Sequence, residues 1–374
     1  MKKAFVLITA LICIISFAGI VSLAGCKEEQ AESNAVEEEA MGEEEAIVEE
    51  DEGEEDEGEV VAADEELYIN VSGGWSHAPW QQAKVGCQMA DEFWGDELTV
   101  EFAGPPDYNS DEMLAALEAS IARKPTGIIW LSFGVGEDEL LTQYHADGGM
   151  IMDWVGVTGN YPSDIMVGVD NRLFGQDLAK WMIDVMSEKQ GVAKEDVSFK
   201  IGLMTLVGNA LHLTRLDGIM DVLSEYPGVE IVGPTIDEGG DAETAAKNAS
   251  AFIAQNPDVD CYIGTAALTG GALGRALKEA GYAPGEKVVI GADQDPELIV
   301  ALQEGYLHGS LGYSFAAEMF HGITAMHIAH DALVKYTNND KEYGFTVLPQ
   351  RIITPVYRIT GDIAEAMDDM PSPK

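Results

Sequence analysis

From residue 67 onward, short apolar runs alternate with stretches of helical periodicity, and this alternation constrains the fold more than any other feature of the sequence. Short apolar runs between polar or glycine-rich segments are typical of buried strands, and apolar residues three or four positions apart are typical of helices. Strands and helices that alternate in this way form right-handed βαβ units on a parallel sheet. The predicted strands are 67–71, 98–102, 127–131, 150–155, 165–169, 201–206, 229–232, 261–264 and 288–291, and the predicted helices are 81–93, 110–123, 137–146, 213–225, 242–255, 270–280 and 296–304.

The segment from Val167 to Gly175 divides this alternation into two halves. An apolar run ends at Val169, Asp170 and Asn171 follow, and a further helical pattern begins directly after them. Asp or Asn at such a junction can cap the new helix by accepting hydrogen bonds from its first turn. In α/β proteins, ligands bind at the carboxyl ends of strands where two such halves meet. The sequence therefore predicts two Rossmann-like lobes that are hinged here, with a ligand-binding cleft between them.

The end of the chain predicts two more crossings between the lobes. A long helix is expected over 315–335, and a pair of short strands over 348–358 returns to each lobe in turn. The predicted N-terminal lobe is 67–171 with 314–346, and the predicted C-terminal lobe is 172–313 with 347–374. The expected fold class is therefore α/β, with two parallel sheets joined by a three-segment hinge.

The charge of the chain is unusually negative and is concentrated near its start. The formal net charge is −45, and residues 27–66 hold 21 acidic residues against one Lys. A segment of this composition cannot bury a core, so 26–66 is predicted to be a disordered, extended tether. The acidic balance argues against nucleic acid as a partner, since nucleic-acid binding needs a basic surface.

The first 26 residues have the features of a processed lipoprotein signal. Lys2 and Lys3 precede a nearly unbroken apolar run over 4–23, and Leu23-Ala24-Gly25-Cys26 has small residues before a Cys. Residues 1–25 are therefore predicted to be a signal peptide and Cys26 the lipidated residue. The alternative is a transmembrane anchor, because the run is nearly long enough to span a bilayer. Cys87 and Cys261 fall in different lobes and are predicted to be free, buried thiols.

Catalytic and metal-binding motifs are not found in the sequence. It contains no G-x-S-x-G, no H-E-x-x-H and no P-loop, and its seven His residues have no metal-ligand spacing. His321, His327 and His330 lie on the predicted last helix, and we expect them on its exposed face. We predict a binding protein without cofactor or metal, and not an enzyme.

Five short motifs occur in order along some 200 residues of the two predicted lobes. They are Ala103-Gly104-Pro105-Pro106-Asp107-Tyr108 followed by Met113 and Leu117, Gly168 to Gly175, Arg215-Leu216-Asp217-Gly218-Ile219, Asn256-Pro257-Asp258-Val259-Asp260, and Ile290-Gly291-Ala292-Asp293 followed by Pro296-Glu297. From about Leu67 to its end, the chain resembles the type I periplasmic sugar-binding proteins, which include the ribose-, galactose- and autoinducer-2-binding proteins. The same fold occurs in repressors of the lac type, but we expect no DNA-binding head in this chain.

The resemblance implies a sugar site made of stacked aromatic rings with charged and amide groups from both lobes. Arg215 and Asp293 match ligand-binding positions of the ribose-binding protein, and Trp80 matches a stacking aromatic. Trp faces pack well against sugar rings, so Trp75, Trp130 and Trp154 are further candidates, with core packing as the alternative and the favoured one for Trp130.

Several positions depart from the ribose-binding pattern and argue against ribose itself. Ala78 and Ala266 each stand in the place of an Asn, Gly240 in the place of an aromatic residue, and Tyr313 in the place of a Gln. Possible substitute polar contacts are His77, Asn109, Thr265 and Thr269. The position of a ligand-binding Asp of the family falls near Asp153 and Trp154. Two roles are open for Asp170 and Asn171, which either serve as helix cap and hinge or touch the ligand. The predicted ligand-binding set is Trp75, His77, Trp80, Asp153, Trp154, Asn171, Arg215, Thr265, Asp293 and Tyr313.

The function that the resemblance implies is capture of a monosaccharide-like ligand and its delivery to an ABC permease with its ATPase. The protein would be monomeric and extracytoplasmic, in the periplasm or at the cell surface, and held at the membrane by its lipid alone. The alternative is a sensor protein that presents autoinducer-2 or a sugar to a signalling or chemotaxis receptor.

Overall fold

The structure is a computed structural model, and it describes residues 65–75, 78–106, 109–131, 136–155, 159–335 and 349–363. The predicted signal peptide, Cys26, almost all of the acidic tether and His77 lie outside the described residues.

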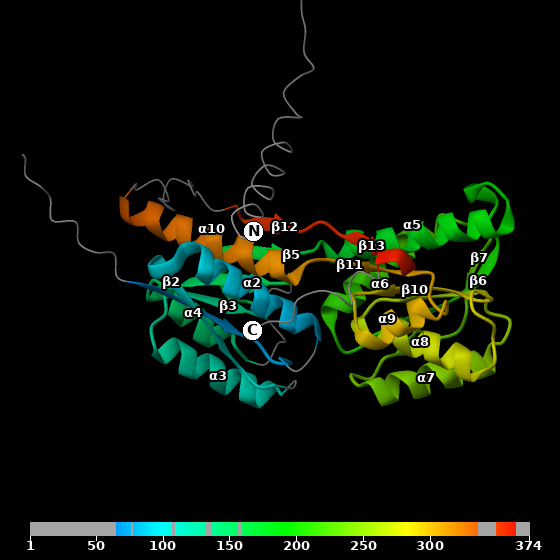
Figure 1. Cartoon of the computed structure of the whole chain (residues 1–374), viewed down its shortest axis with the longest axis horizontal. Coiled ribbons are helices and arrows are strands. Elements are labelled where there is room, and N and C mark those ends of the chain that lie inside the picture. The colour runs from blue at the N-terminus through cyan, green and yellow to red at the C-terminus, as the bar shows by residue number, and fades with distance from the viewer. Residues whose placement is uncertain are drawn as a thin grey trace, which may run out of the picture. The chain divides into compact units, whose positions relative to one another are not determined.

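The first sheet is fully parallel, with strand order β12-β5-β4-β3-β1-β2. Helices α2 and α10 lie side by side over one face of this sheet, and α3 and α4 lie on the other face (Figure 1). Two apolar clusters fill the two faces, one containing Tyr68, Met152 and Met319 and the other Ile69 and Ile151. The bounds are β1 Glu66–Val71, β2 Leu98–Ala103, β3 Gly127–Trp130, β4 Met150–Trp154, β5 Ile165–Gly168, β12 Arg351–Ile353, α2 Ala78–Trp94, α3 Ser110–Ala122, α4 Asp138–Ala146 and α10 Phe315–Lys335, with a 3-10 turn at Gly95–Glu97.

The second sheet has the order β13-β11-β10-β9-β6-β7, with β8 also paired to β6. All of its pairs are parallel except β11 with β13. Helices α5 and α6 cover one face, and α7, α8 and α9 cover the other (Figure 1). The bounds are α5 Asn171–Gln190, β6 Phe199–Thr205, α6 Ala210–Leu223, β7 Val229–Ile231, β8 Ile236–Asp237, α7 Ala242–Gln255, β9 Cys261–Gly264, α8 Ala267–Glu279, β10 Val288–Ala292, α9 Pro296–Gln303, β11 Gly309–Gly312 and β13 Tyr357–Ile359, with a 3-10 turn at Lys194–Asp196.

The chain passes between the two sheets three times within the described residues. The crossings lie between β5 and α5, between β11 and α10, and between β12 and β13. The predicted fold class is therefore confirmed. Because β12 pairs with β5, Arg351–Ile353 belongs to the first sheet, and the boundary predicted at 347 assigned these residues to the wrong lobe.

The glycines of two sequence motifs have a packing role. A Cβ at Gly175 would overlap the backbone carbonyl of Arg215, and a Cβ at Gly218 would overlap that of Arg172. Helices α5 and α6 therefore pack backbone against backbone at these two positions. This close packing fixes the place of Arg215 relative to the first turn of α5.

The cysteine prediction is confirmed, and the histidine prediction is wrong in one respect. Cys87 and Cys261 are both free and buried. His327 is only 3% exposed, because its Nδ1 lies 3.0 Å from Glu66 Oε2, which also takes part in a bond to Tyr68. His330 Nδ1 lies 2.7 Å from Glu66 Oε1. Among the described residues, no group of three or more His, Cys, Asp or Glu side chains is arranged to hold a metal ion.

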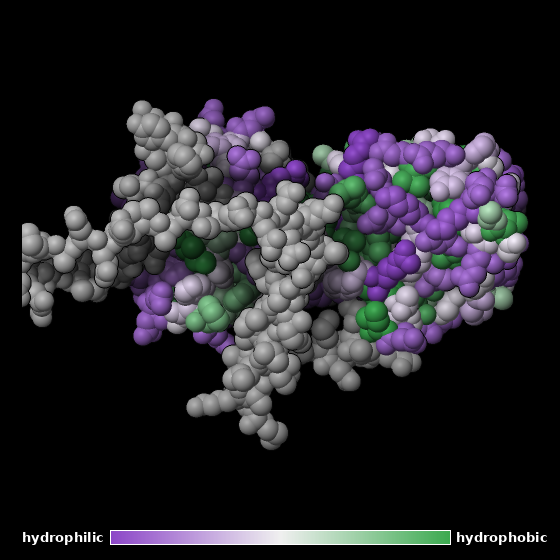
Figure 2. Space-filling model, turned by 90° about the horizontal axis from the view of Figure 1, so that it is seen from above, coloured by the Kyte–Doolittle hydropathy of each residue, from purple (hydrophilic) through white to green (hydrophobic). Residues whose placement is uncertain are grey.

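The visible described surface of the second lobe is mainly polar (Figure 2). Figure 2 shows mainly hydrophilic residues on the visible face of the second lobe, with small apolar areas between them. Within the part of the chain that the structure describes, no helix combines the length and the hydrophobicity needed to cross a membrane.

Candidate functional site

Polar residues line the carboxyl ends of adjacent strands in the second sheet. Thr205 ends β6, Thr265 follows β9 and Asp293 follows β10, and these three strands are parallel neighbours. The hydroxyl oxygens of Thr205 and Thr265 lie 2.6 Å apart, so one donates to the other. Parallel strands end at the same edge of a sheet, and this edge is where α/β proteins bind ligands.

Arg215 on α6 is the centre of the polar cluster. Its side chain is fully buried and donates from Nε to Asn171 Oδ1 (2.9 Å), from Nη1 to the Thr265 carbonyl oxygen (2.8 Å) and from Nη2 to the Tyr313 hydroxyl (3.2 Å). Its Nη1 also lies 3.5 Å from Asp293 Oδ2. The structure thus brings together five of the predicted site residues. Four of the five follow strand ends, namely Asn171, Thr265, Asp293 and Tyr313, and Arg215 reaches them from α6.

Asp293 is held in an unusual conformation with one oxygen unpaired. Its φ of 66° is in the left-handed region, which non-glycine residues adopt rarely. Its backbone N–H donates to the Leu311 carbonyl oxygen at 2.8 Å, and its carbonyl oxygen accepts from the Ser310 hydroxyl at 2.7 Å. Its Oδ1 is buried without a hydrogen-bond partner. Burial raises the pKa of Asp293, although the charge of Arg215 opposes this shift.

Glu238 is a member of the same edge that sequence reasoning missed. It follows β8, and its backbone N–H donates to the Thr205 carbonyl oxygen at 2.8 Å. Glu238 is 4% exposed, and its Oε2 has no hydrogen-bond partner. Burial, together with the nearby charges of Asp293, Asp237 and Asp295, raises the pKa of Glu238 to about 8. The only sequence signal was an acidic pair before two glycines, because β8 is too short to give a strand pattern.

The first lobe contributes a group of aromatic rings. The half-buried Trp80 meets the buried Trp154 and Phe315 edge to face, with centroids 4.9 and 5.3 Å apart. Phe315 also packs on Tyr313 at 4.6 Å, so the aromatic group is continuous with the Arg215 cluster. Such rings suit the C–H faces of a sugar.

A buried carboxyl connects this aromatic group to a crossing segment. Glu318 on α10 accepts from Trp154 Nε1 at 2.8 Å and from the Thr354 hydroxyl at 2.6 Å. Thr354 lies in the crossing between β12 and β13. Burial raises the pKa of Glu318 to about 7, although both hydrogen bonds lower it.

Gln294 joins the two lobes directly and was also missed. Its Nε2 donates to Gln82 Oε1 on α2 (3.0 Å) and to the Tyr313 carbonyl oxygen (3.3 Å). Its Oε1 accepts from the Tyr357 hydroxyl at 3.4 Å. It is one residue beyond Asp293 and lies just after the end of β10, so the rule that ligands lie at strand ends could have found it.

The structure does not bring Trp75 and Asp153 to the Arg215 cluster. Trp75 donates from Nε1 to the Ala103 carbonyl oxygen at 3.1 Å and packs edge to face on Phe102. Asp153 lies on the face of β4 opposite to Trp154, because side chains alternate along a strand. Its neighbours are Tyr161, whose hydroxyl is 3.4 Å from Oδ1, and Glu137. The first-lobe Asp is therefore separated from the cluster by the sheet itself.

The remaining candidates mainly have structural roles. Asn109 caps α3 by accepting from Glu112 N, Asp170 caps α5 by accepting from Leu173 N, and Thr269 bonds the backbone of Ala266 at the start of α8. Trp130 is fully buried in the core of the first lobe, as predicted.

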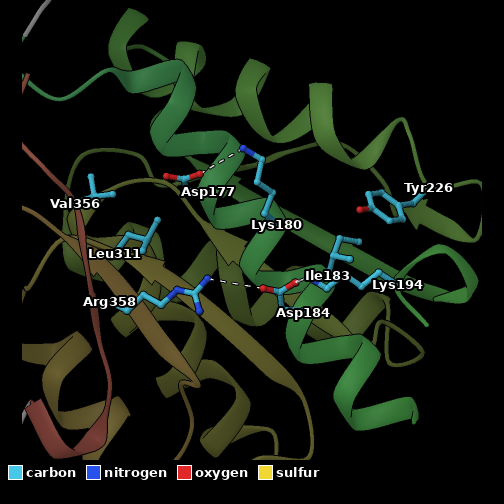
Figure 3. Close-up of a pocket in the computed structure, with 9 residues that line it drawn as sticks. All are labelled: Asp177, Lys180, Ile183, Asp184, Lys194, Tyr226, Leu311, Val356 and Arg358. Atoms are coloured by element: carbon cyan, nitrogen blue, oxygen red, sulfur yellow. Dashed lines mark ion pairs between the residues drawn. The ribbon is translucent and has the colours of Figure 1, made fainter. Parts of the chain in front are cut away.

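A pocket of about 470 Å³ lies beside α5, and its residues differ from those of the cluster. Figure 3 shows its charged side chains turned toward one another, with Lys180 Nζ 3.5 Å from Asp177 and Arg358 Nη2 3.9 Å from Asp184. Both of its carboxylates are thus already paired with cations, whereas the strand-end cluster holds buried oxygens without partners. The cluster is the better candidate site despite the size of the pocket.

The sequence matches the model of one protein family over residues 70–335, described as a periplasmic binding protein domain. The chain therefore belongs to the periplasmic binding protein family. This membership confirms the predicted resemblance and the prediction of a binding protein that is not an enzyme.

Several solved structures have the same fold. A sugar-binding protein of a sugar ABC transporter from Bacillus halodurans has a TM-score of 0.69 at 19% identity, covering 80% of this chain and 99% of its own. The arabinose-binding protein AraP from Geobacillus stearothermophilus has a TM-score of 0.68 at 19% identity, with 81% and 99% covered. GanP, a glucose-galactose binding protein from the same organism, has a TM-score of 0.66 at 19% identity, with 82% and 99% covered. No curated protein sequence is significantly similar to this chain.

Proposed function

We propose that this chain captures a sugar or sugar-like small molecule between its two lobes and delivers it to an ABC importer. The observation that carries the proposal is the buried Arg215–Asp293 pair with an unpaired Asp293 Oδ1, next to the aromatic group around Trp80. Solved structures with the same fold include an arabinose-binding protein and a glucose-galactose-binding protein, which supports a sugar as the ligand.

The residue chemistry suits a polyhydroxylated ligand. A guanidinium has five N–H donors, and Arg215 holds four protein partners, so it is both fixed in place and able to donate further. The unpaired Asp293 Oδ1 can accept from a hydroxyl, and a charge-assisted bond of this kind is among the stronger ones. Trp80, the least buried of the three rings in its group, would stack on the ring of the sugar.

Ligand binding would be coupled to lobe closure through the crossing segments. Asn171 and Tyr313 flank two of these segments and both bond Arg215, and Thr354 in the third bonds Glu318. A ligand that contacts both lobes favours the conformation in which both contacts exist. The permease would then recognise that conformation.

The proposed location is extracytoplasmic, with the protein held at a membrane by lipid on Cys26. The membership of the periplasmic binding protein family supports the location, and the sequence around Cys26 supports the lipid. The acidic segment would act as a spacer between the lipid and the first strand.

The test is thermal unfolding of the purified protein in the presence of pentoses, hexoses, polyols and autoinducer-2. A ligand at a hundredfold excess over its Kd should raise the stability by about 2.7 kcal/mol, which is visible as a higher melting temperature. A shift that is lost in Asp293→Ala supports the proposed site. If no sugar, polyol or autoinducer-2 shifts the melting temperature, the proposed function is wrong.

A further inference from the structure

Two buried carboxyl groups at the same edge of the second sheet each have an oxygen without a partner. Glu238 follows β8 and Asp293 follows β10, and they are 4% and 7% exposed. Their atoms Glu238 Oε2 and Asp293 Oδ1 are two of the three buried side-chain polar atoms without a hydrogen-bond partner among the described residues. A buried acceptor without a partner costs free energy, so a ligand that donates to both would recover it.

The charges around these two oxygens are almost all negative. Asp237 and Asp295 add to the negative potential at Glu238, and Arg215 is the cation that faces Asp293. His212 lies beside Thr265, but burial and the charge of Arg215 lower its pKa to about 3, so it is neutral at pH 7. Arg215 therefore pairs with Asp293, while the neighbours that shift the pKa of Glu238 are all acidic.

We propose that Glu238 contacts the ligand and that, together with Asp293, it selects a sugar carrying a protonated amine, that is, an amino sugar. This inference rests on the proposed function, because it names the class of sugar bound at the same site. The protonated amine of the ligand would pair with Glu238 as Arg215 pairs with Asp293.

A protonated amine fits this edge better than a hydroxyl does. An ammonium group has three N–H donors and no acceptor, so it matches a site whose two free side-chain oxygens can both accept. Its charge would also favour the ionised form of Glu238, which would release its proton and pair with the ammonium, and a neutral sugar cannot do this. Burial beside Asp293 raises the pKa of Glu238 to about 8, and a bound cation would lower it again.

The test is calorimetric titration of the full-length protein in detergent with matched sugars. Glucosamine is compared with glucose, galactosamine with galactose, and each amine with its N-acetyl derivative, which keeps the nitrogen and loses the charge. The free amine should bind about tenfold or more tighter than both counterparts, as expected for a hydrogen bond to a charged group.

Two variants assign the preference to Glu238. Glu238→Gln keeps the size of the side chain and should reduce the amine preference about tenfold or more, while binding of the neutral sugar persists. Glu243→Gln removes an equal charge from an exposed position in the first turn of α7, and it should leave the preference unchanged.

The outcomes separate this inference from the proposed function. A neutral sugar that binds as tightly as its amine, or a preference that survives in Glu238→Gln, overturns the inference and leaves the proposed function standing. If neither amino sugars nor neutral sugars bind, both fail. If Glu238→Gln does not fold, the N-acetyl comparison on the unchanged protein still decides the charge requirement.

Discussion

The two lobes each have a buried Asp near the carboxyl end of an equivalent strand, and the two side chains have opposite surroundings. Strands β4 and β10 are each third from the sheet edge formed by β12 or β13. Asp153 and Asp293 each have one buried oxygen without a partner. Asp293 lies 3.5 Å from Arg215, whereas Asp153 faces the hydroxyl of Tyr161 and the like charge of Glu137.

This difference separates a carboxyl group that is paired with a fixed cation, and that we propose contacts the ligand, from one whose surroundings favour its protonated form. Burial raises the pKa of Asp153 to about 8, with the bond from Tyr161 opposing and Glu137 adding to the shift. At Asp293 a fixed cation opposes the effect of burial. A buried carboxyl at a strand end is therefore not enough to define a site, and the neighbouring charge decides its role.

Removal of Arg215 should have the largest effect on stability. Arg215→Met leaves Asp293 buried without its cation, and breaking a buried pair in this way costs about 3–5 kcal/mol. Urea unfolding at pH 7 measures the loss. The control is Arg172→Gln, whose exposed pair with Asp221 should contribute about 0–1 kcal/mol. Equal losses in the two variants would contradict the central place of Arg215.

Loss of Glu318 should come next. Glu318→Ala leaves the Trp154 N–H and the Thr354 hydroxyl without their acceptor. Each buried group left in this way should lower the free energy of unfolding by about 1–3 kcal/mol. Glu318→Gln keeps one acceptor oxygen and should lose less. The free energy of unfolding of both variants tests this. If Glu318→Ala unfolds with the same free energy as the unchanged protein, the connection to the third crossing segment does not contribute to stability.

Asp153→Asn should change how stability depends on pH. The pKa of Asp153 is near 3.8 in the unfolded chain and about 8 in the fold, so between these values the folded state holds a proton that the unfolded state has lost. Its contribution therefore falls as pH rises from about 4 to about 8, by up to about 1.4 kcal/mol per pH unit.

The variant lacks this contribution, so it should gain stability relative to the unchanged protein as pH rises. Unfolding in urea at pH 5 and pH 8 gives the difference directly. A difference that stays constant between the two pH values would show that Asp153 ionises normally and would remove the contrast with Asp293.

The smallest effect concerns the aromatic group. Trp80→Ala should weaken sugar binding about tenfold, or about 1.4 kcal/mol, because a half-buried ring on the ligand side is lost. Trp94→Ala on the same helix is the control, since Trp94 bonds Thr324 and packs beside His327. Comparable affinity losses in the two variants would place the ligand away from Trp80.

The sequence predicted the regular elements well and the shortest ones poorly. The bounds of α7, β9 and α10 were predicted to the residue, because their apolar patterns end at clear polar or turn positions. Strands β8 and β11 were missed, since one has two residues and the other is Gly-Ser-Leu-Gly. The omission of β8 also hid Glu238, whose position depends on that strand.

The candidate site was predictable where a motif fixed the register. Arg215 and Asp293 came from motifs that resemble the family, and the structure places them in one cluster. For Asp153 and Trp154 the register was uncertain by one or two residues, and a shift of one residue exchanges the faces of a strand. Sequence alone therefore could not tell whether the side chain of Asp153 or that of Trp154 points toward Trp80 and Phe315.

The most direct test of the account is ligand-dependent thermal unfolding of Asp293→Asn beside Asp153→Asn. We predict that a sugar, neutral or aminated, raises the melting temperature of the unchanged protein and of Asp153→Asn, and that this rise is lost in Asp293→Asn. A rise that persists in Asp293→Asn, or is lost in Asp153→Asn instead, would contradict the assignment of the site to the Arg215 cluster.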